Sequence, residues 1–296
     1  MPGSIRINTI NHVGIPIWDR RVALPFYRDI LGLQVIPSMV DSPNIVWTRT
    51  LDGTMVHLIE PADGENLGRP HVAFEVEDFD STVESVQNSG YPDITEAGER
   101  HDGQRHIFAT DNDGNRLEFA TAGGHRPSSR VADALGYTSE TGENVVVDSP
   151  STIKIITINH VGLPVNDRAE CMLMYRDLLN LGVIPHQVDG NSLAWTEMAD
   201  GSMIHVIDPP KSIGPRGDSR QHVAFEVANI EATADALDEA GVEIVGEPGT
   251  RHDGQQFLFI YDPDGNRIEI ATRGDHSETT RTADENGYTS ENGVLL

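Results

Sequence analysis

The strongest constraint on the fold is an internal repeat that spans almost the whole chain. Residues 10–17 read INHVGIPI and residues 158–165 read INHVGLPV, an offset of 148, the difference between His160 and His12. Three further motifs recur in the same order: PHVAFEV at 70–76 as QHVAFEV at 221–227, ERHDGQ at 99–104 as TRHDGQ at 250–255, and DNDGNRLEFAT at 111–121 as DPDGNRIEIAT at 262–272. The repeat predicts two homologous domains, at 1–148 and 149–296.

The C-terminal part of each repeat is a polar tail that also recurs. The segment GYTSE occurs at 136–140 and again at 287–291. We expect C-terminal arms at 123–148 and 274–296, each closing over the cleft of a neighbouring domain.

Each domain contains a second, weaker repeat. In the first domain, helix-like stretches at 23–31 and 81–89 each follow a short apolar strand and end at a glycine. Short strands are expected after them at 34–40, 45–51, 54–60, 105–110 and 115–121, while the segment 91–96 has no clear pattern. The expected fold class is therefore α+β, with two strand–helix–strands modules per domain.

Composition narrows the partners and the compartment. The chain of 296 residues has 21 Lys+Arg against 47 Asp+Glu, a formal charge of −26, which repels nucleic acid and anionic membranes. No apolar run is long enough for a membrane span, and the N-terminus lacks an apolar signal core. Cys171 is the single cysteine, so no intrachain disulfide forms and a cytoplasmic location is expected.

Side-chain alternation along the strands singles out three polar residues in each domain. In NHVGIPI the apolar residues after His12 share one face, so His12 points to the other. The same alternation turns His71 of HVAFEV and Glu118 of NRLEFA away from the core, and the second domain repeats this with His160, His222 and Glu269. Two imidazoles and one carboxylate suit Fe(II), Mn(II), Ni(II) or Zn(II). Glu75 and Glu226 lie on this face as well and are predicted to form a solvated rim.

Equal spacings extend the candidate site. His12 to His57 and His160 to His205 are both 45 residues, and His101 to Glu118 and His252 to Glu269 are both 17. His57 and Glu118 fall at similar places in the two modules of the domain. A pseudo-twofold axis between the modules would bring His12, His57, His71 and Glu118 to one centre.

These motifs resemble those of the vicinal oxygen chelate superfamily, which includes glyoxalase I, extradiol dioxygenases and antibiotic-resistance proteins. The resemblance rests on INHVG with FYRDILG, on PHVAFEV and on the DxDGNRxE pattern, and it covers nearly the whole chain. It implies βαβββ modules that form an open, curved mixed sheet around a divalent metal. By resemblance, the ligands are His12, His71 and Glu118 in one domain and His160, His222 and Glu269 in the other.

Among these relatives, the extradiol dioxygenases are most similar in layout. They share the tandem domains and a triad of two histidines and one glutamate for Fe(II), with further active-site histidines at places that correspond to His205 and His252. The resemblance therefore favours ring cleavage of a catechol-like small molecule by Fe(II) and O₂, with His57, His101, His205 and His252 in proton-transfer or substrate-orienting roles. Two features depart from that group: Phe108 and Phe259 replace its usual tyrosine, and both domains carry ligands.

Two alternatives remain open. A glyoxalase-like lyase or isomerase, or a related hydrolase or epimerase, would use Ni(II), Zn(II) or Mn(II) with a fourth ligand at His57 and His205. A non-catalytic drug-binding protein is the third, although such proteins commonly lack the ligand set. Candidate pocket residues are Trp47 and Trp195 for stacking on a planar substrate and Arg100 and Arg251 for holding an anionic group. A homodimer or higher homo-oligomer is possible.

Overall fold

The computed structural model describes residues 5–62, 70–124, 126, 128–141, 150–208, 221–275 and 280–296. These contain two eight-stranded sheets, one in each repeat, which confirms the α+β fold class and the tandem arrangement. The expected boundary between residues 148 and 149 lies outside the described residues. No helix in the described part of the chain is long and apolar enough to cross a membrane.

The first sheet is built from eight strands with helices between them. Its elements are β1 (Ile7–Pro16), α1 (Arg20–Pro25), the π-helix η1 (Phe26–Ile30), β2 (Gln34–Ile36), β3 (Ile45–Arg49), β4 (Met55–Ile59), β5 (His71–Val76), α2 (Phe79–Asn88), β6 (Gly98–Glu99), β7 (Arg105–Thr110) and β8 (Arg116–Ala120). The strand order is β2-β3-β4-β1-β5-β8-β7-β6. This order is symmetric about the β1–β5 pair, as the inner repeat predicts.

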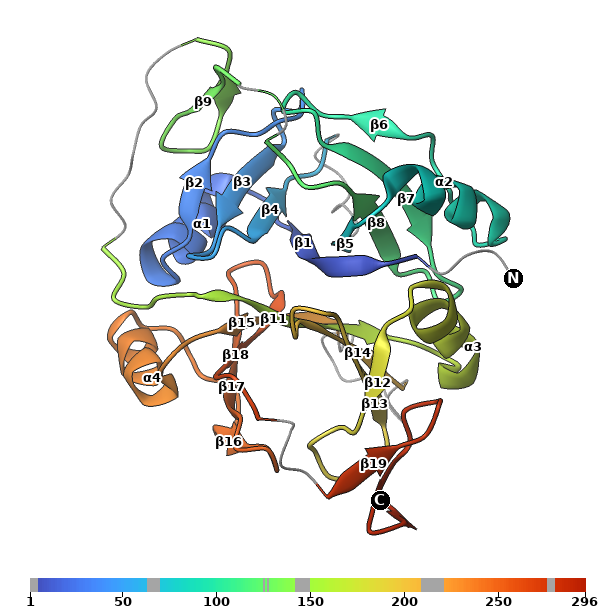
Figure 1. Cartoon of the computed structure of the whole chain (residues 1–296). Coiled ribbons are helices and arrows are strands. Elements are labelled where there is room, and N and C mark those ends of the chain that lie inside the picture. The colour runs from blue at the N-terminus through green and yellow to red at the C-terminus, as the bar shows by residue number, and fades with distance from the viewer. Residues whose placement is uncertain are drawn as a thin grey trace.

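The second sheet repeats the arrangement with the same order. Its elements are β11 (Thr157–Pro164), α3 (Arg168–Met172), η2 (Leu173–Leu178), β12 (Gly182–Ile184), β13 (Leu193–Glu197), β14 (Met203–Ile207), β15 (His222–Glu226), α4 (Ile230–Glu239), β16 (Gly249–Thr250), β17 (Gln256–Tyr261) and β18 (Arg267–Ala271). Figure 1 shows the two curved sheets lying back to back and opening toward opposite sides.

Local differences from the sequence-based expectations have identifiable causes. The strand expected over 34–40 ends at Ile36, because the backbone N–H of Ser38 donates to the side chain of Thr138 instead of to a strand. The helix expected over 23–31 begins earlier, at Arg20, because Asp19 caps it. From Phe26 it widens into the π-helix, in which Leu31 N–H donates to Phe26 C=O.

The domains share one hydrophobic core and a reciprocal set of hydrogen bonds. Apolar residues of both sheets belong to a single buried cluster. The Tyr27 hydroxyl of η1 donates to Asp262 Oδ2 at 2.7 Å, and the Tyr175 hydroxyl of η2 donates to Asp111 Oδ2 at 3.0 Å. Both aspartates begin the DxDGN turns that lead into β8 and β18. The turn before each candidate glutamate is thus anchored by the other domain.

The C-terminal arms pack on their own domains. They form β9 (Val131–Ala132) with β10 (Thr138–Ser139), and β19 (Arg281–Ala283) with β20 (Thr289–Glu291) and β21 (Val294–Leu295). In the first arm Arg28 donates to the C=O of Ala134, and the Arg20 guanidinium lies 4.0 Å from the Tyr137 ring centre. The described arm contacts therefore correct the expectation of closure over a neighbouring domain's cleft.

Candidate metal centre

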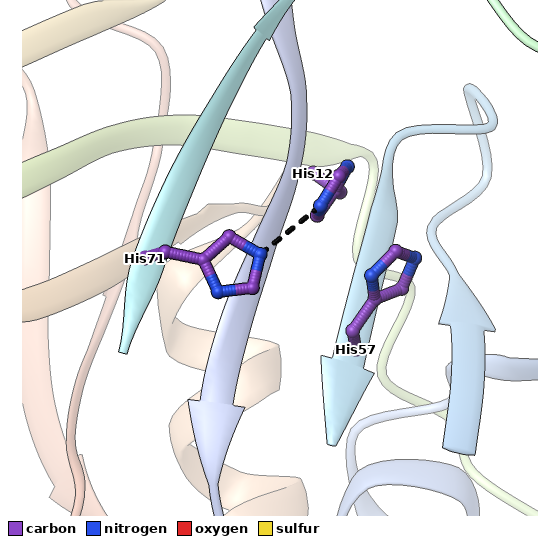
Figure 2. Close-up of side chains that lie close together, drawn as sticks. All are labelled: His12, His57 and His71. Atoms are coloured by element: carbon purple, nitrogen blue, oxygen red, sulfur yellow. Dashed lines mark hydrogen bonds between the residues drawn. The ribbon is translucent and has the colours of Figure 1, made fainter. Parts of the chain in front are cut away.

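Four neighbouring strands bring the candidate ligands to the concave face of each sheet. In the first domain His57 lies on β4, His12 on β1, His71 on β5 and Glu118 on β8, in the spatial order β4-β1-β5-β8. One ring nitrogen from each of the three histidines lies within 4.8 Å of the other two. Figure 2 shows the three rings gathered between the strands, with His12 between His71 and His57. All four side chains are buried.

The distances within the first site fit a metal ion. Nε2 of His12 lies 3.1 Å from Nε2 of His71 and 3.2 Å from Oε2 of Glu118, and the His71–Glu118 distance is 3.7 Å. Ligand atoms bound about 2.1 Å from one ion lie about 3.0–3.4 Å apart at octahedral or tetrahedral angles. The three atoms therefore form a nearly correct ligand triangle.

The second domain reproduces this triangle. Its distances are 3.1 Å from His160 to His222, 3.3 Å from His160 to Glu269 and 3.4 Å from His222 to Glu269. One ring nitrogen of His205 lies within 4.8 Å of a ring nitrogen of His160 and of His222. Both domains consequently carry a complete candidate site.

The glycine of the INHVG motif makes room for the second histidine. Gly14 is paired with His71 across the β1–β5 ladder, and a Cβ atom at Gly14 would overlap the His71 ring. Gly162 has the same relation to His222. The glycine of the motif is thus needed because a larger residue would overlap the ring of the second histidine.

A hydrogen-bond relay fixes which nitrogen of His12 faces the site. The Glu75 carboxylate accepts from Nδ2 of Asn11 at 3.4 Å, so the Asn11 oxygen must face the other way. That oxygen lies 2.9 Å from Nδ1 of His12 and can only accept, so Nδ1 carries the proton. Nε2 of His12 then presents a lone pair to the other ligands. Such outer partners are typical of metal-bound histidines.

Arg100 neutralises the buried glutamate. Its Nη2 lies 2.9 Å from Oε1 of Glu118, on the oxygen that does not face His12, and its Nη1 donates to Gln104. Gln104 in turn donates to Asn11 Oδ1 at 3.2 Å and to the C=O of Thr121 at 2.9 Å. The network leaves Oε2 of Glu118 directed at the two histidines.

The protonation states suit cation binding. Burial lowers the pKa of His71 to about 3 and that of His160 to about 4. Burial alone raises the pKa of the Glu118 carboxyl, but His12 and Arg100 lower it by more, so its pKa is below the ordinary value. The site therefore offers neutral imidazoles and a charged carboxylate at neutral pH.

His57 lies at the edge of the ligand triangle. Its ring centre is 4.0 Å from that of His12, and Trp47 stacks on its other side at 4.1 Å. Burial lowers the pKa of His57 well below its usual value. His57 Nε2 has no hydrogen-bond partner among the described residues. In the second domain, Trp195 stacks on His205 in the same way, at 4.4 Å.

The remaining predicted site residues are placed differently from the expectation. His101 and His252 lie outside the buried groups: their side chains are 40% and 48% exposed and pair with Asp41 and Asp189 at 2.9 and 3.0 Å. Their neighbours Arg100 and Arg251 point inward instead, onto the glutamates.

Several contacts around the site were not predicted from the sequence. Trp47 and Trp195, considered for substrate stacking, each cover a histidine ring. Glu226 was predicted to be a solvated rim residue, but it is buried and accepts from Asn159 at 3.0 Å. Asn11 and Gln104 were missed, although their recurrence as Asn159 and Gln255 within the same motifs was a usable signal.

Comparison with known proteins identifies the family and agrees with the fold. The family described as "Glyoxalase/Bleomycin resistance protein/Dioxygenase superfamily" matches residues 9–119 and 157–270. The chain therefore belongs to this superfamily, and the predicted vicinal oxygen chelate fold is confirmed.

Solved structures with the same fold include enzymes of two kinds. The 2,3-dioxygenase LapB from Pseudomonas sp. KL28 is similar at a TM-score of 0.64 and 17% identity, over 93% of this chain and 95% of that one. The Mn(II)-bound glyoxalase from Novosphingobium aromaticivorans gives 0.65 and 16%, over 92% and 84%. The homoprotocatechuate 2,3-dioxygenase from Brevibacterium fuscum, in its anaerobic substrate complex, gives 0.62 and 18%, over 93% and 83%. At these identities the likeness concerns the fold.

Proposed function

We propose that this protein is a divalent-metal-dependent enzyme with one centre in each domain. His12, His71 and Glu118 would hold one ion, and His160, His222 and Glu269 the other. His57 and His205 would transfer protons beside them. The proposal rests on the two matching ligand triangles, each with a buried, neutral histidine at its edge.

The reaction that this arrangement supports best is proton transfer on a small molecule with neighbouring oxygen atoms, as in a glyoxalase-like lyase or isomerase. A bound Mn(II), Ni(II) or Zn(II) ion would act as a Lewis acid on the substrate oxygens. His57, whose buried Nε2 has no hydrogen-bond partner among the described residues, could accept a proton from a carbon atom next to such an oxygen. Stacking on Trp47 holds the plane of the His57 ring, and burial of the site excludes bulk water.

Deuterium exchange tests this function directly. The protein is loaded anaerobically with Zn(II), Ni(II) or Mn(II) in D₂O and incubated with α-hydroxycarbonyl compounds and with the hemithioacetal of methylglyoxal and glutathione. NMR should show deuterium incorporation or turnover that a chelator abolishes. The double variant His57→Ala/His205→Ala should lose it while retaining the metal. Activity that persists in this variant would reject the proposed proton-transfer role.

An extradiol-type dioxygenase is the second candidate. The observation that favours it is the compact triangle of two histidines and one glutamate, since Fe(II) oxygenases need such a triad with open positions. Two observations place it second. His101 and His252 are exposed and paired elsewhere. Phe108, with its ring centre 5.8 Å from that of His71, supplies no hydroxyl at the place of the usual tyrosine.

An assay on protein loaded with Fe(II) separates the two candidates. Fe(II)-loaded protein mixed with catechols under air would consume O₂ and form a yellow ring-cleavage product if it is a dioxygenase. The proposed lyase or isomerase shows neither. Ligand binding that is unaffected by chelators and by His222→Ala would instead indicate a non-catalytic binding protein.

A further inference from the structure

Two cavities lie at corresponding places in the repeats, the second with Asp52 of the first domain in its lining. The two cavities have volumes of about 570 Å³ and 680 Å³, which suit a small molecule. Five lining positions correspond through the repeat: Ile36 with Ile184, Pro37 with Pro185, Arg49 with Glu197, Gly53 with Gly201 and Gly123 with Gly274. Trp47, which stacks on His57, also lines the first cavity, so the cavity adjoins the candidate metal centre.

The strand register places position 49 beside the ligands. Arg49 is paired with Met55 across β3 and β4, and Met55 is paired with His12 across β4 and β1. Residues paired in this way point to the same face, and two strand spacings separate Arg49 from His12 by about 10 Å between Cα atoms. A substrate group a few bonds from the chelating oxygens is therefore within reach of the arginine.

Glu197 occupies the equivalent place in the second domain. It is paired with Met203 across β13 and β14, and Met203 is paired with His160 across β14 and β11. The row Arg49–Met55–His12 thus corresponds to the row Glu197–Met203–His160. The methionine and the histidine are the same in both domains, whereas the first residue changes from a cation to an anion.

In the first cavity, Arg49 is the charged side chain that a substrate can reach. Its side chain is exposed, and its Nε donates to Oε1 of Gln34 at 2.8 Å. No carboxylate among the described residues forms an ion pair with its guanidinium. The other charged lining residue is Asp102, whose two oxygens accept from the backbone N–H groups of Gln104 and Gly124.

The second cavity is dominated by carboxylates. Glu197 shares its lining with Asp52, Asp200 and Glu226, and Arg273 is the lining cation. An anionic substrate that Arg49 attracts in the first domain would be repelled here.

We propose that Arg49 and Glu197 give the two centres opposite charge preferences. The first domain would accept a small substrate that carries a carboxylate, and the second would reject it in favour of a neutral or cationic one. This inference rests on the proposed metal-dependent function.

Calorimetry with two probes that share the same chelating catechol group tests the difference in charge preference between the domains. Catechol is neutral, and 3,4-dihydroxybenzoate adds a carboxylate to it. Zn(II)-loaded His222→Ala protein reports on the first domain, and Zn(II)-loaded His71→Ala protein reports on the second. Comparing the ratio of the two affinities between the domains removes the intrinsic difference between the probes.

The anionic probe should be favoured in the first domain by at least roughly fivefold relative to the second. Arg49→Glu should abolish this preference, and Glu197→Arg should create it in the second domain. Arg6→Glu, which changes an exposed arginine outside both cavities, is the matched control and should have no effect. The preference should weaken at high salt.

This experiment distinguishes an error in the charge assignment from an error in the metal centres. Chelator-sensitive binding of both probes with an unchanged ratio in Arg49→Glu and Glu197→Arg would overturn the charge assignment alone. Absence of any chelator-sensitive binding would overturn the metal centres and this inference with them.

Discussion

Tyr175 of the second domain donates a buried hydrogen bond to Asp111 of the first, and it does so at the turn that leads into the strand of Glu118. Tyr27 and Asp262 form the reciprocal bond. Each domain therefore helps to hold the loop that precedes a candidate ligand in the other. The DxDGN motif, which marks the repeat in the sequence, is part of the domain interface.

The first prediction concerns this interface. Tyr175→Phe should lower the free energy of unfolding by about 1–2 kcal/mol, because it leaves the buried Asp111 carboxylate with one fewer donor. Urea unfolding measures the change. Tyr27→Phe is the matched variant and should cost a similar amount. An unchanged unfolding midpoint in both variants would show that these bonds do not stabilise the interface.

The second prediction concerns the relay behind His12. Asn11→Ala should weaken metal binding in the first domain by roughly 10–100-fold, because it frees the orientation and tautomer of the imidazole. Competition with a chromophoric chelator measures the affinity. Asn8→Ala is the control, since Asn8 also donates to Glu75 but does not contact a histidine in the described structure. Equal affinities in the two variants would contradict the role of the relay.

The third prediction concerns the stability of the metal-free protein below neutral pH. The buried histidines have a lowered pKa in the folded state, so below about pH 6.5 the unfolded chain binds protons that the folded chain does not. The free energy of unfolding should therefore fall as pH drops from 6.5 toward 4, by up to about 1.4 kcal/mol per pH unit for each such histidine.

Chelator-treated protein unfolded in urea at pH 7.5 and 5.5 provides this measurement. Replacing one titrating group, as in His57→Phe, should make the dependence on pH shallower. Stability that is constant or rises toward pH 5.5 would show that the histidines are not held neutral by the fold.

The repeat made much of this architecture predictable from the sequence. Equal spacings in the two halves identified His12, His57, His71 and Glu118, and strand alternation placed His12, His71 and Glu118 on the face where the structure has them. Spacing alone could not decide the direction of adjacent side chains in a turn. Arg100 and His101 recur together in both domains, but the arginine enters the site and the histidine faces solvent.

The outer parts of the site depend on contacts distant in sequence. The sequence did not predict that the Trp47 ring stacks on His57, a contact set by the pairing of β3 with β4. The arms likewise pack through separate side-chain contacts, such as the hydrogen bond from Ser38 N–H to Thr138. Such contacts leave no periodic pattern in the sequence.

Metal stoichiometry tests the central claim most directly. After loading with Zn(II) and gel filtration, elemental analysis should find two ions per wild-type chain, one in His71→Ala, one in His222→Ala and none in the double variant. His101→Ala, which changes an exposed histidine outside the buried sites, should retain two. Wild-type protein without bound metal, or metal content unchanged in the double variant, would contradict the assignment of these centres.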